Sequence, residues 1–176
     1  MLQLNFSPFP ELTTERLVLR EMRDSDADAL FEIRNGGAKQ RTMEETIALL
    51  ERIKTDIAAN QAISWTITLK ENGRMIGDMA FWRILHEHHR AELGYSLHKD
   101  FHRNGYATEA LGVVLQYGFD VMKLHSVEAN TAPENIASIS LLKKYGFEQE
   151  GYFRENYYLD GNFYDTTSFS LLTPHR

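Results

Sequence analysis

The 176-residue sequence contains no cysteine and only four prolines. Without cysteine the chain has no disulfide, no thiol nucleophile and no thiolate ligand for a metal. No apolar run approaches the roughly 18 residues that a membrane-spanning helix needs. The first residues also lack a basic region followed by an apolar one, so we expect no signal peptide. These absences predict a cytoplasmic protein that does not partner with a membrane.

Positive charge is scarce as well. The chain has 19 lysines and arginines against 25 aspartates and glutamates, a formal net charge of −6. Phosphate backbones reward positively charged surfaces, so this balance argues against nucleic acid as a primary partner. The length and the 43% hydrophobic content suit one domain over residues 1–176 that buries a sizeable core.

The first third of the chain is predicted to hold a strand and two helices. Alternating apolar and polar residues predict a half-buried strand over 16–21. Ser25 with Asp28, and Thr42 with Glu45, have the spacing of capping boxes that begin two helices. The second helix carries an apolar stripe with helical spacing, formed by Ile47, Leu50, Ile53 and Ile57.

The rest of the chain alternates between strands and helices. The Asn72-Gly73 turn predicts a hairpin, and Asp160-Gly161 predicts a second one near the end. Between them lie a predicted strand, a helix, a short strand and a second helix, over 89–97, 106–122, 125–130 and 135–147. This interleaving predicts a mixed sheet of the α/β or α+β class.

The segment HRNGYATEA, residues 102–110, places Gly105 in a polar loop between a predicted strand and a predicted helix. A tight turn uses the conformational freedom of glycine, and the first turn of a helix leaves backbone N–H groups without partners. No Gly-Lys-Ser/Thr follows and G-x-G-x-x-G is absent, which excludes a Walker A loop and a dinucleotide fingerprint. The loop is therefore either a plain connector or a phosphate-binding turn with Arg103 beside it.

The stretch LHKDFHRNGYATEAL resembles the acyl-CoA loop of the GNAT N-acetyltransferase superfamily, Gln/Arg-x-x-Gly-x-Gly/Ala. Gly105 and Ala107 match this pattern, whereas His102 stands where glutamine or arginine is usual. Leu97 matches the strand-end position whose backbone pairs with the pantetheine arm. The resemblance implies that the cofactor is bound by Leu97 and by His102, Arg103, Asn104, Gly105, Tyr106, Ala107 and Thr108.

A second match lies about 30 residues further on. NIASISLLKKYGF resembles the superfamily segment N-x-x-S-x-x-L-L-x-K-x-G-F. Helical spacing places Asn135, Ser138 and Leu142 on one face, where the two polar side chains could meet the amide-rich arm of coenzyme A. Alternatively, Asn135 merely caps the helix and Ser138 points to solvent.

Residues 11–30 and 150–172 resemble the RimJ/RimL-like branch, so the resemblance covers nearly the whole chain. It implies a single-domain GNAT fold: a twisted, mixed and mostly antiparallel sheet, splayed at the cofactor site and flanked by helices. It implies acetyl-CoA as cofactor and direct attack by a primary amine, either the α-amine of a ribosomal or other protein or a small amine. Homodimers are common in this branch, which allows a homodimer here.

Glu92 is predicted to be the catalytic base, because it lies on the strand that leads to the cofactor position. Strand alternation puts it on one face with Gly94 and Ser96. A glutamate on a strand is, however, usually a solvated or salt-bridged surface residue.

The resemblance implies two further catalytic elements. A backbone N–H near Leu97 would stabilise the developing oxyanion. Leu142 holds the position where many members have a tyrosine as general acid, so Ser138 is the substitute donor to the leaving thiolate.

Trp82, Tyr95 and Tyr164 are predicted to line the acceptor pocket, and Tyr157 could do so too, although aromatic residues on strands are more often part of the core. The role of Asp165 stays open. Residues 86–90, HEHHR, are predicted to form a polar loop and no metal site, since no distant fourth ligand is indicated.

Two competing functions remain at this point. A non-catalytic acyl-CoA-binding or sensor module would keep the loop and lose the chemistry, and a nucleotide-phosphate-binding protein would bind without coenzyme A. The segment 34–41 is short where relatives often have a longer acceptor-side loop. A small amine therefore remains an open alternative to a peptide.

Overall fold

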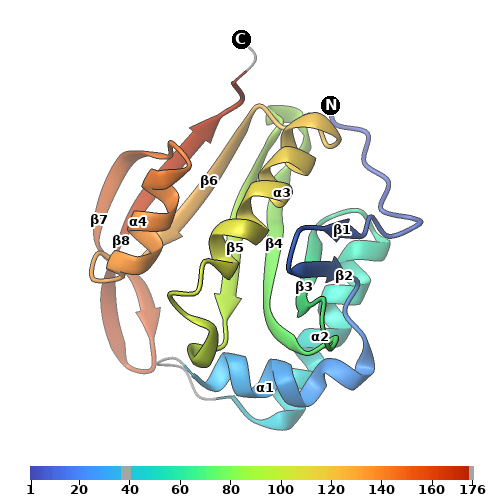
Figure 1. The fold of residues 1–176 in the computed structure, drawn as a ribbon. Helices are drawn as coiled ribbons and strands as arrows, with labels where there is room; N and C mark the ends of the chain where they lie inside the picture. The colour runs from blue at the N-terminus through green and yellow to red at the C-terminus, as the bar shows by residue number, and fades with distance from the viewer. Residues whose placement is uncertain (37–40, 175–176) are drawn as a thin grey trace.

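One sheet of eight strands organises the computed structural model, which describes residues 1–36 and 41–174 (Figure 1). The strand order is β1-β2-β3-β4-β5-β6-β8-β7. Neighbouring strands are antiparallel except β5 and β6, which run parallel. The predicted mixed, mostly antiparallel sheet is therefore confirmed.

The predicted order of strands and helices is also confirmed, with β1 as an unpredicted addition. The strands are β1 (Leu12–Thr13), β2 (Leu17–Arg20), β3 (Ile63–Leu69), β4 (Met75–Leu85), β5 (Arg90–Leu97), β6 (Ser126–Thr131), β7 (Glu148–Leu159) and β8 (Asn162–Leu172). The helices are α1 (Ala27–Asn35), α2 (Met43–Ala58), α3 (Tyr106–Asp120) and α4 (Ile136–Lys144). None of these described helices is long and apolar enough to cross a membrane.

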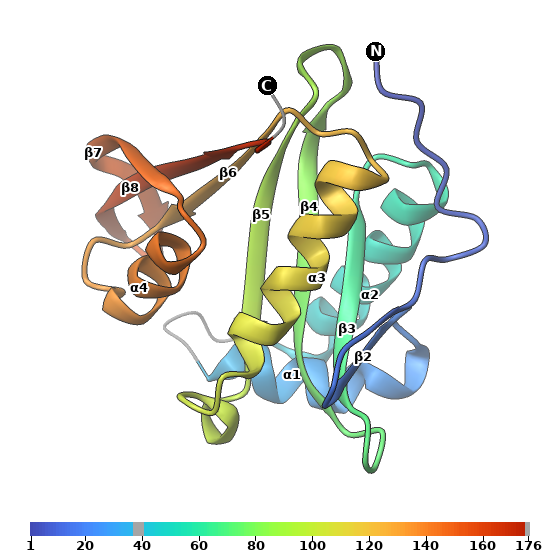
Figure 2. The ribbon, with the colours of Figure 1, turned by 45° about the horizontal axis from the view of Figure 1, so that its top comes forward.

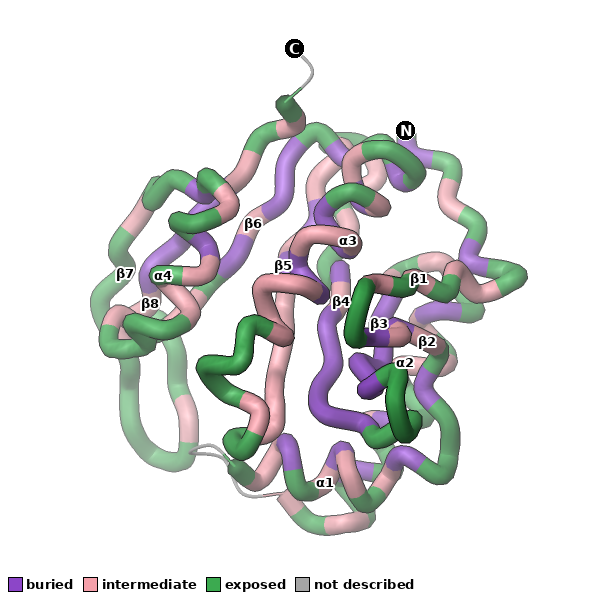
Figure 3. Tube along the Cα trace, viewed as in Figure 1, coloured by how far each residue is buried: buried purple, intermediate pink, exposed green. Residues whose placement is uncertain are grey.

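Helices cover both faces of the sheet. Figure 2 shows α3 in front of β4 and β5, α1 and α2 behind β3 and β4, and α4 beside β6 and β8. Under α3, Trp65 packs edge-on against Phe81 and Tyr117. A Cβ on Gly118 would come within 2.8 Å of the Phe81 ring, so this glycine permits close packing of α3. Figure 3 shows the buried residues concentrated in β3 and β4, whereas β7 is exposed along most of its length.

The two predicted capping boxes have different outcomes. The Thr42 hydroxyl accepts from the Glu45 N–H at 3.2 Å and the Glu45 carboxylate accepts from the Thr42 N–H at 2.9 Å, which confirms the second box. The first box is wrong, because α1 begins at Ala27, after a 3₁₀ turn over Asp24–Asp26. In this turn the buried carboxylate of Asp26 accepts hydrogen bonds, not the Ser25 hydroxyl.

The apolar stripe of α2 is narrower than predicted. Leu50 and Ile57 are buried and Ile53 packs against them, but Ile47 is 49% exposed. Successive side chains of a helix point in directions about 100° apart, so Ile47 points about 60° away from Leu50 and lies at the edge of the stripe.

The ion pair of Arg20 with Asp26 makes stability depend on pH. Both guanidinium N–H contacts measure 2.8 Å, and the Arg23 N–H donates to the same carboxylate at 2.8 Å. Burial raises the pKa of Asp26, but these hydrogen bonds outweigh it and lower the pKa overall. The pair therefore stabilises the folded state above the unfolded pKa of about 3.9, and this contribution is lost as the pH falls through the folded value.

Asp26→Asn is expected to lower the free energy of unfolding by about 2 kcal/mol at pH 7. The difference from wild type should shrink as the pH falls below about 4, because the wild-type carboxyl is then protonated in the unfolded state and, at still lower pH, in the folded state too. Urea unfolding at pH 7 and pH 3 measures both, with the exposed Asp28→Asn as control. An equal difference at the two pH values would contradict the assignment.

Candidate active site

The parallel pairing of β5 and β6 stops after three residues. Arg90, Ala91 and Glu92 are in register with 126–128 of β6. Beyond that point β5 continues beside β4, and β6 continues beside β8 (Figures 1 and 2). We call the separated parts, residues 93–97 of β5 and 129–131 of β6, the splay. Its inner edges have no ladder between them and can pair with an extended, amide-bearing ligand.

The loop before α3 presents unpaired backbone N–H groups. Arg103 and Gly105 have φ values of 61° and 81°, and Gly105 is the N-cap of α3. No backbone N–H of residues 103–108 donates to an acceptor in the described part of the chain. These groups lie at the positive end of the α3 dipole, which is the arrangement that binds phosphate.

Two contacts hold this loop in place. The Arg16 guanidinium donates to the Glu109 carboxylate at 2.7 Å and to the Asn104 carbonyl at 3.1 Å, and it lies 4.3 Å from the centre of the Tyr106 ring. The His102 ring Nε2 lies 2.9 Å from the Leu97 carbonyl oxygen. The unusual histidine therefore ties the loop to the end of β5, while the amides stay available. The loop and the splay together fit a coenzyme A diphosphate and its extended arm.

Tyr95 and Ser138 meet across the splay. The Tyr95 hydroxyl of β5 lies 2.6 Å from the Ser138 hydroxyl of α4. Burial raises the pKa of Tyr95, and the contact with Ser138 only partly opposes this, so the phenol stays protonated at neutral pH. Asn135 caps α4 by accepting from the Ser138 N–H at 3.1 Å. Asn135 thus caps the helix through its side-chain oxygen, and the Ser138 side chain faces Tyr95.

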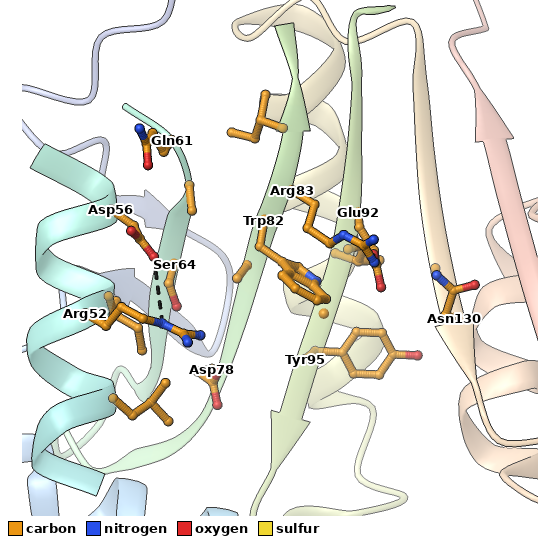
Figure 4. Close-up of a pocket in the computed structure, with 18 of the residues that line it drawn as sticks. Arg52, Asp56, Gln61, Ser64, Asp78, Trp82, Arg83, Glu92, Tyr95 and Asn130 are labelled. Carbon is orange, nitrogen blue, oxygen red and sulfur yellow. Dashed lines mark hydrogen bonds and ion pairs between the residues drawn. The ribbon is translucent and has the colours of Figure 1, made fainter. Parts of the chain in front are cut away.

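A cavity of about 1090 Å³ extends from α2 across the sheet to α4 (Figure 4). Five of the predicted site residues line it: Trp82, Glu92, Tyr95, Asn135 and Ser138. The Glu92 carboxylate accepts from the Arg83 guanidinium at 2.9 Å, and its side chain is 12% exposed. Glu92 is therefore both ion-paired and in contact with the cavity.

The structure does not place Tyr164 in this cavity. It lies on β8 before the part that pairs with β6 at Thr167, and it is 42% exposed. Its register partner Tyr157 of β7 lines the cavity instead. Asp165 accepts from the Tyr152 hydroxyl and the Glu155 N–H, so it holds the last hairpin together.

The histidines of residues 86–90 do not converge. The ring of His86 contacts the Leu2 carbonyl at 3.3 Å, and the ring of His89 contacts the Lys123 carbonyl at 3.2 Å. Within the described ranges no three histidine, aspartate or glutamate side chains group as metal ligands.

Sequence reasoning missed a buried polar pair on the cavity floor. The Arg34 guanidinium of α1 donates to the Asp78 carboxylate at 2.6 Å and to the Ser96 hydroxyl at 2.7 Å. Burial raises the pKa of Asp78, while Arg34 opposes this. Strand alternation places Asp78 on the face of Trp82, and this signal could have found it.

Comparison with known proteins agrees with this geometry. The model of the acetyltransferase (GNAT) domain matches residues 16–148. The chain is 33% identical to the uncharacterized N-acetyltransferase YoaA of Bacillus subtilis, over 94% of this chain and 98% of the relative. It is 28% identical to the [ribosomal protein uS5]-alanine N-acetyltransferase of Escherichia coli, over 95% of this chain and 93% of the relative. The spermidine N(1)-acetyltransferase of Escherichia coli matches at 28% over 52% of this chain and 50% of the relative.

Solved structures show the same fold. A putative ribosomal-protein-serine acetyltransferase from Vibrio cholerae superposes with a TM-score of 0.82 at 22% identity, covering 94% of this chain and 99% of that one. RimL, a ribosomal L7/L12 α-N-protein acetyltransferase in complex with coenzyme A, gives 0.84 at 19% identity, covering 93% and 98%. The chain belongs to the GNAT acetyltransferase family and is an acetyl-CoA-dependent N-acetyltransferase with the fold of RimL.

Proposed function

We propose that the acceptor is the α-amine of a peptide or protein. The observation that carries this proposal is the cavity, which crosses the four strands β3 to β6 between α2 and α4 and reaches Glu92, Tyr95 and Ser138 at the splay. A space of this length suits an extended chain. The relative that acts on a ribosomal-protein alanine matches over nearly the whole chain, whereas the spermidine enzyme matches over about half of it.

The loop and the splay are proposed to hold the acetyl donor. Backbone N–H groups of 103–108 would bind the diphosphate, with Asn135 offering its side-chain nitrogen to the arm. Acetyl-CoA supplies an activated thioester at this place. A backbone N–H near Leu97 would face the developing oxyanion.

Glu92 is proposed to take a proton from the incoming ammonium, directly or through one water, so that the neutral amine can attack. Arg83 orients this carboxylate through the 2.9 Å contact. As the new C–N bond forms and the C–S bond breaks, the Ser138 hydroxyl would donate a hydrogen bond to the departing thiolate. The second proton, lost by the attacking nitrogen, would pass through water to that thiolate, which leaves the amide and coenzyme A. Tyr95 positions that hydroxyl from the opposite side of the splay.

The test is an acceptor panel with acetyl-CoA: peptides with a free α-amine, the same peptides with a blocked N-terminus, spermidine and amino sugars. We expect coenzyme A release only with free peptides, and mass spectrometry should place the added acetyl group on the α-amine. Turnover confined to spermidine or an amino sugar would replace the peptide with a small amine. Tight acetyl-CoA binding with no turnover on any amine would favour a non-catalytic acyl-CoA-binding module.

A further inference from the structure

The cavity wall is rich in arginine, although the whole chain carries a net charge of −6. Four arginines and three acidic residues line it: Arg34, Arg41, Arg52, Arg83, Asp56, Asp78 and Glu92. A polyamine site would need an excess of carboxylates, and this wall has the opposite balance.

Two of the four guanidiniums are already neutralised. Arg34 is paired with Asp78 at 2.6 Å, and Arg83 is paired with Glu92 at 2.9 Å. Asp78 and Glu92 therefore each already have a cation beside them. Neither carboxylate is free to bind an additional positive charge of a polyamine acceptor.

The other two guanidiniums are held less firmly: Arg52 makes one long ion pair, with Asp56. The Nε of Arg52 is 4.0 Å from the Asp56 carboxylate, and the Arg52 side chain is 72% exposed. Its guanidinium extends from α2 beneath Ser64 of β3 toward the middle of the cavity (Figure 4). No partner for the Arg41 guanidinium lies in the described part of the chain. The α2 end of the cavity therefore holds two cations against one carboxylate, Asp56, and the exposed Arg52 can turn toward a ligand.

We infer, building on the proposed function, that the acceptor peptide carries an acidic side chain close to its N-terminus and that Arg52 and Arg41 select it. A guanidinium binds a carboxylate through two parallel hydrogen bonds, which gives direction as well as charge. Ser64 of β3, close to the Arg52 guanidinium in Figure 4, is level with Gly94 of β5, two residues from Glu92. Two strand spacings and two residues along the strand, together about 12 Å, therefore separate the two positions. An extended peptide covers about 3.4 Å per residue, which places the acid at residue 2, 3 or 4.

The experiment uses peptide series that differ only at residue 2, 3 or 4, which is glutamate, glutamine or lysine, with spermidine as a further acceptor. At low ionic strength kcat/KM is expected to be roughly fivefold higher for glutamate than for glutamine at one of these positions, and lowest for lysine. The glutamate preference should decline as salt is added, because salt screens an exposed ion pair.

Variants assign the preference to these arginines. Arg52→Gln, and more completely Arg41→Gln with Arg52→Gln, should bring the ratio of glutamate to glutamine peptides toward one. Lys54→Gln is the matched control: it removes one positive charge from α2 at a residue paired with Asp24 and Glu51, outside the cavity lining, and should keep the ratio.

Three outcomes overturn the inference and leave peptide acetylation standing: equal use of glutamate and glutamine peptides at all positions, a preference for lysine, or a ratio that persists in the double variant. Failure of every peptide to release coenzyme A would instead remove the proposed function itself.

Discussion

Replacing Thr108 with aspartate is expected to weaken acetyl-CoA binding about 100-fold without destabilising the protein. Thr108 is the third residue of α3, beside the free amides that are proposed to bind the diphosphate. Two like charges about 6 Å apart near a protein surface repel by about 3 kcal/mol, which corresponds to this factor. The native Glu109 escapes this conflict, because Thr14 and Arg16 hold its carboxylate.

Thr108→Asn is the matched control, since asparagine has nearly the shape of aspartate and no charge. Calorimetric titration with coenzyme A should show a small loss of affinity for Thr108→Asn and a large loss of affinity for Thr108→Asp. The stability of the ligand-free variants should follow the opposite order. Aspartate interacts favourably with the α3 dipole, so Thr108→Asp should have a free energy of unfolding about 0.5 kcal/mol higher than Thr108→Asn. Equal affinities of the two variants for coenzyme A would show that the diphosphate binds elsewhere.

Glu92→Gln is expected to lower kcat/KM for the acceptor by at least about 100-fold, with little change in acetyl-CoA affinity. Glutamine keeps the shape of glutamate but cannot take a proton, and general-base catalysis typically contributes a factor of this size. The variant then depends on amine that is already neutral in solution. Because a peptide α-amine has a pKa near 8, raising the pH from 7 to 9 should restore activity about tenfold in the variant.

The control for this result is Arg83→Gln, which breaks the same ion pair and leaves the carboxylate in place. It should lose less activity than Glu92→Gln and should not gain the steep rise toward pH 9. If both variants lost the same activity with the same pH dependence, Glu92 would serve the ion pair and not the proton transfer.

Local sequence signals predicted the elements and the loop well. Three of these signals act within a few residues of chain, and the structure confirms each: the capping box of Thr42 with Glu45, the Asn72-Gly73 turn, and Gly105 before α3. The cap at Asn135 is equally local, since its partner is only three residues away.

The long-range arrangement of the site was not predictable in the same way. Tyr95 and Ser138 lie 43 residues apart, and Arg34 and Asp78 lie 44 apart, so each contact depends on how α1 and α4 pack on the sheet. The placement of Tyr164 in the cavity was not predictable for a related reason. Tyr164 lies on the part of β8 that pairs only with β7 and extends past the end of β6. The Ser25 prediction failed because the neighbouring Asp26 carboxylate was the stronger acceptor for the Arg23 N–H and Arg20.

The short ladder between β5 and β6 makes the stability of the folded protein depend on its cofactor. The last third of the chain is joined to the rest through three residue pairs of β5 with β6, a shared hydrophobic core and contacts such as that of Tyr95 with Ser138. A cofactor that touches both sub-sheets adds its binding free energy to the folded state. Bound acetyl-CoA would therefore make the folded enzyme harder to unfold, in addition to supplying the acetyl group.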